Sequence, residues 1–329
     1  NGGINNWSYV NSATLPLNAV LEVELSERID PTTINTDGAS GQSSFVLYSN
    51  TQNRFIPGEG VLAADGRHLR FVSEEALQAG HSYRLYVTYN TYLYDLAGNR
   101  INGTSRTFTA SNVEDNIAPV VQAVTLSDGL TGVPTNTKLN VRFSEAINVT
   151  SITDFDLRDA LNNTVPTSLT ANSTLDLLTL NLSAQLAPSS AYRLNIVGID
   201  DIADNQLAVP AMIDFTTGLG EDTVRGNIIQ WSFDADEVLA LDATLEVILD
   251  ERVDPTSVDA ARFYLWDETL NANVPGAISV AADGTTLTFD PDDALEQNHQ
   301  YRLYVSYSYF TDLAGNLINR GSRRFFSDE

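Results

Sequence analysis

The chain has 329 residues, of which 43% are hydrophobic, and it carries a formal net charge of −25 and no cysteine. The acidic balance argues against nucleic-acid binding, which requires a basic surface, and the lack of cysteine excludes disulfides, thiol catalysis and thiolate metal sites. No apolar run approaches the roughly 20 residues that a membrane-spanning helix needs, so we expect no membrane insertion.

One pattern occurs three times along the chain: a short apolar strand opens each unit, and a tyrosine strand followed by a polar turn closes it. The opening strands are predicted at residues 21–25, 139–143 and 245–249, and the closing strands at 83–87, 192–196 and 301–305. A period of about 110 residues is the size of one β-sandwich domain and is too long for a solenoid repeat. We therefore expect three domains, at residues 1–112, 113–219 and 220–329.

Within each unit the intervening segments also read as strands. A third strand is predicted at residues 45–48, 155–158 and 263–266, and each is followed by a proline, at Pro57, Pro166 and Pro275. Apolar and polar residues alternate with a period of two, and no stretch longer than a turn or two has a helical period. The sequence therefore predicts an all-β fold with about seven short strands per unit, as in a sandwich.

The closing tyrosines Tyr83, Tyr192 and Tyr301 each lie six residues after a leucine. In immunoglobulin-like sandwiches, a tyrosine near the start of the sixth strand hydrogen-bonds back across a corner, two residues before a cysteine site. Here Leu85, Leu194 and Leu303 occupy that later site, so a core leucine takes the place of the disulfide.

The segment from Val133 to Ile147, together with the Tyr-Arg-Leu strands and the Asp-x-Ala-Gly-Asn turns, resembles the bacterial Ig-like domain family of S-layer proteins and large surface adhesins. The resemblance covers nearly the whole chain. It implies three tandem immunoglobulin-like β-sandwiches in an elongated array, in a family whose members serve as spacers, assembly units or adhesive domains of exported proteins.

The three units are not equivalent. The outer two share a Trp-Ser-aromatic start and a His-x-Tyr-Arg-Leu-Tyr strand, and the middle unit has neither. The middle unit also carries Asp204 where the others have Gly98 and Gly315. If that position has a left-handed backbone, aspartate tolerates it at modest cost. The arrangement is therefore A-B-A, and the middle unit separates a specialised outer pair.

Catalytic chemistry finds little support in this sequence. The histidines are His68, His81 and His299, and the last two occupy one equivalent loop position. No strand-turn-helix element is predicted that could hold a nucleophilic serine. We expect no enzymatic activity.

Acidic residues gather where one unit passes to the next, and calcium binds oxygen ligands that adjoining loops can supply. We expect possible junctional Ca²⁺ ligands at Glu114, Asp115, Glu221, Asp222, Asp128 and Asp234. Glu27, Glu145 and Glu251, which follow the opening strands, are further possible ligands. The alternative is that acidic residues fall in the linkers by chance. The Asp-x-Ala-Gly-Asn turns are predicted to be structural, with Asp and Asn side chains that hold the local backbone rather than a metal.

Aromatic and arginine side chains form a second group, because the period of two turns Arg84 and Tyr86 outward, together with their counterparts Arg302 and Tyr304. Such a surface suits packing against another domain, stacking on sugar rings or a protein interface. Contact with a neighbouring strand of the same molecule is an equally open alternative.

Together these features predict a structural or interaction segment of an exported bacterial cell-surface protein. Its partners would be copies of itself or neighbouring domains of a longer chain. Three roles remain open: an adhesin that binds a glycan or a host surface protein, a protomer of an extracellular filament or S-layer, and a non-catalytic part of a secreted enzyme. The chain begins at Asn1 without a basic, apolar leader, so we expect a mature product or a piece of a longer chain.

Overall fold

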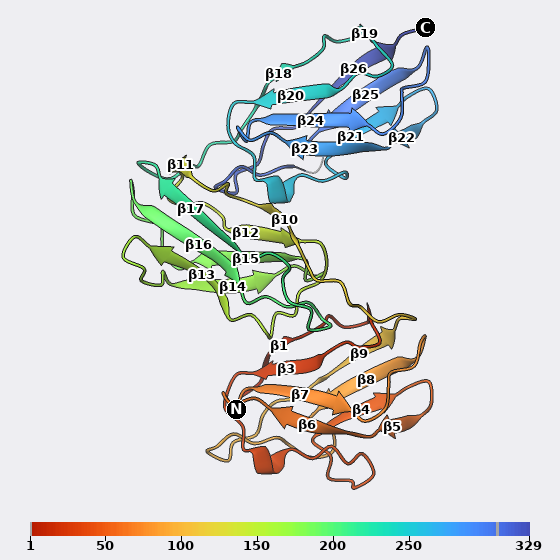
Figure 1. Ribbon diagram of the computed structural model, residues 1–329, viewed down its shortest axis with the longest axis vertical. Coiled ribbons are helices and arrows are strands. Elements are labelled where there is room, and N and C mark those ends of the chain that lie inside the picture. Colours follow the sequence, from red (N-terminus) through yellow and green to blue (C-terminus); the bar gives the residue numbers. More distant parts are fainter. Residues whose placement is uncertain (1, 307–308) are drawn as a thin grey trace.

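The computed structural model describes residues 2–306 and 309–329, and it consists of three β-sandwiches in a row (Figure 1). Each sandwich is built from two sheets, so that the described residues form six sheets in all. The chain steps sideways from one sandwich to the next and gives a zigzag rather than a straight rod. The prediction of three tandem immunoglobulin-like domains is confirmed. No described helix is long and apolar enough to cross a membrane.

Domain 1 packs a four-stranded sheet, β1-β3-β7-β6, against a five-stranded sheet, β2-β9-β8-β4-β5. Its strands are β1 (Ile4–Trp7), β2 (Ala13–Leu15), β3 (Leu21–Leu25), β4 (Phe45–Ser49), β5 (Arg54–Ile56), β6 (Gly58–Leu62), β7 (His68–Ser73), β8 (Ser82–Val87) and β9 (Ser105–Ala110), with a 3₁₀ turn, η1 (Pro31–Thr33).

Domain 2 packs the sheet β10-β12-β15-β14 against the sheet β11-β17-β16-β13. Its strands are β10 (Val121–Val124), β11 (Leu130–Val133), β12 (Asn140–Phe143), β13 (Asp154–Asp159), β14 (Thr167–Ala171), β15 (Leu177–Leu182), β16 (Ala191–Val197) and β17 (Ala211–Thr217).

Domain 3 repeats the plan of domain 1, with the sheets β18-β20-β24-β23 and β19-β26-β25-β21-β22. Its strands are β18 (Ile228–Trp231), β19 (Val238–Leu239), β20 (Leu245–Leu249), β21 (Phe263–Asp267), β22 (Ala272–Val274), β23 (Gly276–Val280), β24 (Thr286–Pro291), β25 (Gln300–Val305) and β26 (Gly321–Ser327), with a 3₁₀ turn, η2 (Pro255–Ser257).

The alternating sequence pattern places the cores. In β8 the residues Tyr83, Leu85 and Val87 are buried, while the residues between them lie on the outer face. Each domain has its own cluster of buried apolar side chains between its two sheets. The prolines mark the crossing from one sheet to the other. Pro57 and Pro275 each lie between strands of opposite sheets, where a missing N–H removes no ladder bond.

The predicted tyrosine corner is present in all three domains. The main-chain N–H groups of Gln78, Ala187 and Glu296 each donate a hydrogen bond of 2.9 Å to the hydroxyl of the tyrosine five residues later. Since each tyrosine ring is buried, its hydroxyl satisfies a main-chain group at the edge of the core. The corner fixes the start of the closing strand and therefore the position of the polar turn that follows it.

Candidate functional site: two carboxylate clusters at the domain junctions

The polar turn after each closing strand has one geometry in all three domains. Its aspartate accepts hydrogen bonds from the main-chain N–H two and four residues later and from the asparagine side chain at the end of the turn. In domain 3, these bonds to Asp312 come from Ala314 (2.8 Å), the Asn316 N–H (2.9 Å) and Asn316 Nδ2 (2.9 Å). The turn is structural, as predicted, and it also holds one carboxylate rigidly at the end of the sandwich.

A second carboxylate comes from the loop after the opening strand. Isolated β-bridges pair Ile29 with Asp95, Ile147 with Asp201 and Val253 with Asp312, which ties this loop to the polar turn in every domain. Glu27, Glu145 and Glu251 lie two residues before the bridged residue of that loop. The end of each sandwich therefore carries a Glu and an Asp at equivalent places.

The third carboxylate comes from the preceding domain through the linker. Asn18 of domain 1 holds linker residue Asp115 by both main-chain groups, at 2.9 Å from the Asp115 N–H and 2.7 Å from its carbonyl. Asn136 of domain 2 holds Asp222 with the same two distances. Each linker aspartate is thus held in place by the domain that precedes the linker.

These three sources meet twice. Carboxylate oxygens of Asp115, Glu145 and Asp201 lie within 4.8 Å of one another at the first junction, and those of Asp222, Glu251 and Asp312 do so at the second. The second cluster borders a cleft of about 490 Å³ between domains 2 and 3. Within the described part of the chain, Glu251 Oε1 is shielded from solvent and has no hydrogen-bond partner.

The proton affinities of these groups reflect the crowding. Burial, followed by the negative charges of Asp115 and Asp201, raises the pKa of Glu145 to about 7. Burial, followed by the charges of Asp312 and Asp222, raises the pKa of Glu251 to about 8. Both junctions therefore hold negative charge that is costly to keep unless a proton or a cation compensates it.

The domain ends also contact each other directly. At the first junction the Val20 N–H donates to the Ile202 carbonyl, and at the second the Lys138 N–H donates to the Leu313 carbonyl, both at 2.7 Å. Leu313 is only 6% exposed and belongs to the core cluster of domain 2, although it is part of domain 3. Ile202 packs in the same way against the core of domain 1.

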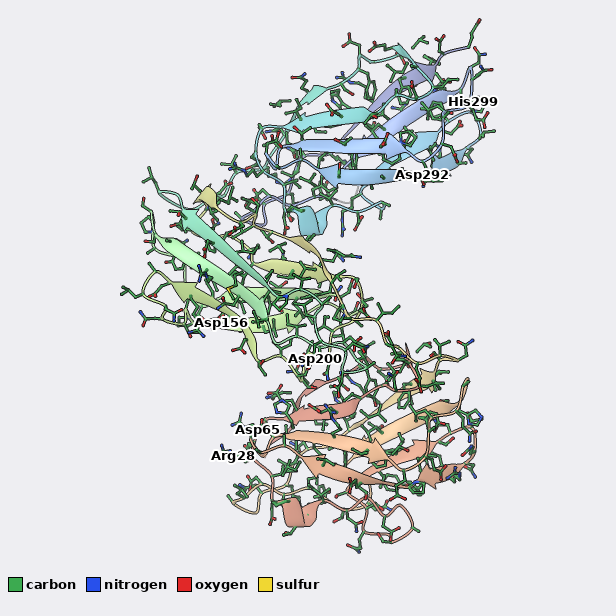
Figure 2. The ribbon with its side chains drawn as sticks, in the orientation of Figure 1. Arg28, Asp65, Asp156, Asp200, Asp292 and His299 are labelled. Atoms are coloured by element: carbon green, nitrogen blue, oxygen red, sulfur yellow. The ribbon has the colours of Figure 1, made fainter. Side chains whose placement is uncertain are left out.

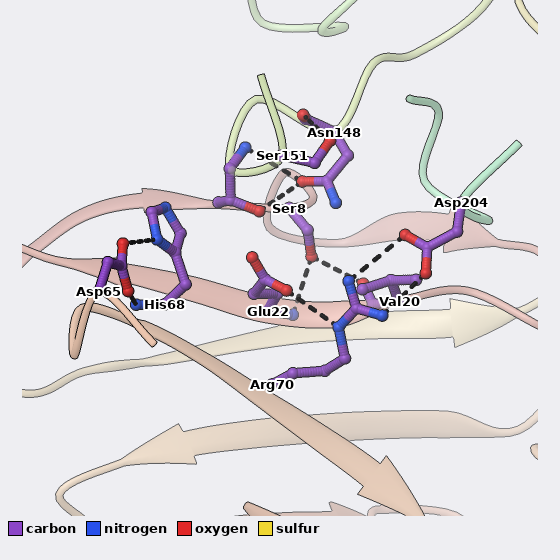
Figure 3. Close-up of polar contacts among 10 residues, drawn as sticks. Ser8, Val20, Glu22, Asp65, His68, Arg70, Asn148, Ser151 and Asp204 are labelled. Atoms are coloured by element: carbon purple, nitrogen blue, oxygen red, sulfur yellow. Dashed lines mark hydrogen bonds and ion pairs between the residues drawn. The ribbon is translucent and has the colours of Figure 1, made fainter. Parts of the chain in front are cut away.

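Each junction has further contacts of its own. At the first, Arg70 bridges Glu22 of its own domain (2.9 Å) and Asp204 of domain 2 (2.8 Å), as Figure 3 shows. Asp204 has a left-handed backbone, with φ of 65°, like its counterparts Gly98 and Gly315, so the condition set for this position in the sequence is met. Figure 2 shows the neighbouring Asp200 at the edge of domain 2 that faces domain 1.

At the second junction, Asn140 donates to the buried carboxylate of Asp254 (2.8 Å) and Arg142 donates to the Thr256 carbonyl (2.8 Å).

The structure brings together only part of the predicted ligand set. Asp115 and Asp222 lie in the clusters, and so do Glu145 and Glu251. Glu114 and Glu221 are exposed and outside them, because neighbouring residues of an extended linker point to opposite sides.

Asp128 and Asp234 also lie outside the clusters. Asp128 accepts the Asp214 N–H (2.9 Å), and the Asp234 N–H donates to Glu237 (2.7 Å). Sequence reasoning missed Asp201 and Asp312 as cluster members. Their recurrence in register with Glu145 and Glu251 was the available signal.

The predicted aromatic and arginine residues belong to neither carboxylate cluster, and they lie on the outer faces of β8 and β25. Tyr86 packs against Tyr89, with ring centroids 4.7 Å apart, and Tyr304 stacks on Tyr264 at 4.9 Å. Arg302 is paired with Glu268 at 2.6 Å. Arg84 makes no ion pair with any described residue, and its buried Nε has no hydrogen-bond partner.

Comparison with known proteins gives one family. A family model described as a bacterial Ig-like domain matches residues 7–110, 115–217 and 231–327. Among curated proteins, no sequence matches this chain.

Solved structures show likeness of fold alone. CopC from Methylosinus trichosporium OB3b is 16% identical, with 32% of this chain and 94% of that chain covered and a TM-score of 0.25. Domains 1–6 of the surface layer protein SbsC are 10% identical, with 99% and 54% covered and a TM-score of 0.25. Titin domains A168–A170 are 10% identical, with 99% of each chain covered and a TM-score of 0.23.

Proposed function

The chain belongs to the bacterial Ig-like domain family, and from that premise we propose that it is a spacer and assembly segment of an exported bacterial cell-surface protein. The proposal is supported by the way in which the domains are joined. The same main-chain contacts recur at both junctions, and domains 2 and 3 each place an apolar side chain, Ile202 and Leu313, against the core of the domain before it. Because such junctions fix each domain relative to the next, they also set the distance between the two ends of the chain, which is what a spacer requires.

The junction clusters take a divalent cation in this proposal, and calcium is the ion that suits them. Three carboxylates converge from two domains, and Glu251 Oε1 has no hydrogen-bond partner among the described residues. Calcium accepts six to eight oxygens in flexible geometry, whereas magnesium demands a near-ideal octahedron. At the second junction, waters in the adjoining cleft would complete the coordination. The ion would fix the angle between domains and compensate the negative charge whose burial, followed by repulsion between carboxylates, raises the pKa values of Glu145 and Glu251.

The decisive experiment compares the intact chain in chelator and in millimolar calcium. Calorimetric titration should give two calcium sites per chain. Small-angle scattering should show a narrower distribution of interdomain distances in calcium than in chelator. At free calcium about 100-fold above Kd, linkage predicts about 2.7 kcal/mol of stabilisation per site. Asp222→Asn should remove one site and leave the other, and Glu221→Gln is the matched control. Unchanged melting temperature and scattering would refute the calcium proposal.

A second candidate role, glycan binding, is favoured by one observation in domain 1. Arg193 and Arg302 are paired with Asp214 and Glu268, whereas the equivalent Arg84 is paired with no carboxylate in the described part of the chain. It lies beside a chain of aromatic contacts on the same face, from Tyr48 to Phe55 (5.1 Å), Phe55 to Tyr89 (5.4 Å) and Tyr89 to Tyr86 (4.7 Å). The Arg84 guanidinium lies over the Tyr86 ring, 5.7 Å from its centroid. Aromatic faces beside a guanidinium that has no carboxylate partner among the described residues suit a sugar that carries a carboxylate.

An array of neutral and uronic-acid oligosaccharides tests this candidate with the whole chain. Binding restricted to acidic sugars and lost in Arg84→Gln, but retained in Arg302→Gln, would support it. Binding that both variants lose equally, or an empty array, would contradict it.

A further inference from the structure

The end of domain 1 that is not covered by another domain repeats the receiving half of both junctions. Asp95 accepts hydrogen bonds from Ala97 (2.8 Å), the Asn99 N–H (2.7 Å) and Asn99 Nδ2 (2.8 Å), as Asp201 and Asp312 do from their own turns. The Ser26 N–H donates to the Gly3 carbonyl, which matches Ser144 with Val120 and Asp250 with Asn227. The main chain thus enters all three domains in one register.

At both occupied junctions the preceding domain covers this face with the same set of contacts. It donates an N–H to the carbonyl of the residue after the turn aspartate, at 2.7 Å in both cases. The side-chain amide of the turn asparagine also donates a hydrogen bond to the main-chain carbonyl of the linker aspartate. Asn205 donates to Asp115 (3.2 Å), and Asn316 donates to Asp222 (3.1 Å).

In domain 1 the equivalent groups have the same local geometry, but no described residue of another domain contacts them. Leu96, the counterpart of Leu313, is 68% exposed, whereas Leu313 is 6% exposed. No described residue donates to the Leu96 carbonyl, and Asn99 Nδ2 bonds only to Asp95.

We propose that this end of domain 1, comprising Glu27, Asp95, Leu96 and Asn99, is a third joint face that receives the C-terminal end of another bacterial Ig-like domain. The register identifies what the partner must bring. Asp115 and Asp222 each lie five residues before the main-chain carbonyl of Val120 and Asn227, so the matching aspartate falls three residues before Asn1. The partner therefore carries an acidic linker that leads into the start of domain 1.

The outer end of domain 3 is a poor match for this face, which argues against a second copy of the chain as the occupant. Asn18 and Asn136 donate to the linker aspartate, but the equivalent residue of domain 3 is Asp242, which cannot donate. Thr244 stands where Val20 and Lys138 provide the contacting strand end, and it is exposed. The fitting partner is an end of the kind that domains 1 and 2 present.

The test uses a four-domain chain, in which an added copy of residues 115–224 precedes Asn1 so that Val224 joins Asn1 as it normally joins Arg225. Domain 2 is suited to this because it has a core between its own two sheets. Leu96→Ala should lower the melting temperature of the four-domain chain in chelator by several degrees and leave the original chain unchanged. Equal effects of Leu96→Ala in both chains would overturn the proposal.

Calcium stoichiometry provides a second readout, which rests on the proposed function. The four-domain chain should bind three ions instead of two, and Asp222→Asn in the added copy alone should restore two. If three-domain and four-domain chains bind none, the calcium proposal fails, while the Leu96 measurement still decides whether the face is a joint. If the original chain associates end to end and Leu96→Asp abolishes this, the occupant is a second copy and our assignment of the partner is wrong.

Discussion

At the scale of single residues, the junction glutamates carry the most unusual chemistry in the chain. Glu145 and Glu251 sit among carboxylates that the fold cannot move away, since Asp201 and Asp312 are fixed by three hydrogen bonds each. Proton and cation compete for the same sites. Each reduces the negative charge of the cluster. A proton binds to one carboxylate oxygen, whereas a calcium ion coordinates several oxygens at once.

This competition predicts an inverted pH dependence in the absence of calcium. Because the folded pKa values, about 7 for Glu145 and about 8 for Glu251, lie above the ordinary value of 4.5, the folded state binds protons more readily than the unfolded state. The stabilisation is complete below pH of about 4.5 and is lost as the pH rises through about 7 to 8. In chelator, the melting temperature should therefore fall between pH 5.5 and about 8.5.

The matched control is the double variant Glu145→Gln, Glu251→Gln, whose melting temperature should vary much less over the same range. Saturating calcium should reverse the trend in the original chain, because the ion binds the deprotonated carboxylates better at high pH. A flat profile for the original chain in chelator would contradict the assignment.

At the scale of elements, the repeated strands were predictable because apolar and polar residues alternate with a period of two in every copy. The tyrosine corner was predictable for the same reason, since its spacing recurs three times. The site was harder to predict. Asp115 and Asp201 meet only because domain 2 turns one particular face toward domain 1, and no pattern within a strand encodes that contact. Asp128 was misplaced because closeness to a linker in sequence does not select a side of the sandwich.

The corner makes a separate prediction about stability. Tyr192→Phe removes the acceptor of the Ala187 N–H and should cost about 1–3 kcal/mol, as expected for a main-chain donor left unsatisfied at the edge of a core. Denaturant unfolding of the intact chain measures the loss, which should be confined to domain 2. Tyr92→Phe, at a ring that is 43% exposed, should change stability by less than about 0.5 kcal/mol. Equal losses in the two variants would show that the corner bond contributes little.

At the scale of the whole molecule, the A-B-A pattern corresponds to two junctions that share one plan and differ in reinforcement. The second junction adds Asn140 and Arg142, which reach into the η2 segment of domain 3. The first relies on Arg70, whose counterparts on β15 and β24 are Thr179 and Thr288. The Asp204 that replaces glycine in domain 2 is explained by this contact, because its left-handed backbone aims a carboxylate at Arg70.

Loss of that contact should loosen the first junction alone. Arg70→Thr leaves Glu22, which is 7% exposed, without its cation, and removes an ion pair worth about 1 kcal/mol. The chain lacks cysteine, so spin labels can be placed at will, for example at Gln42 and Leu161 across the first junction and at Leu161 and Leu270 across the second. Pulsed electron paramagnetic resonance of Arg70→Thr should show a broader distribution of distances between the two labels that span the first junction. The distribution between the labels that span the second junction should not change.

Asp204→Gly separates the ion pair from the burial of Glu22, because Arg70 keeps its 2.9 Å contact with Glu22. The glycine also relieves the left-handed backbone, so the stability of domain 2 should be unchanged or slightly higher while the first junction still loosens. If Arg70→Thr broadens the distribution and Asp204→Gly does not, the junction depends on the buried Glu22 rather than on the pair between domains. If neither does, the shared contacts of Asn18, Val20 and Ile202 are sufficient to hold the angle, and the two junctions are mechanically equivalent.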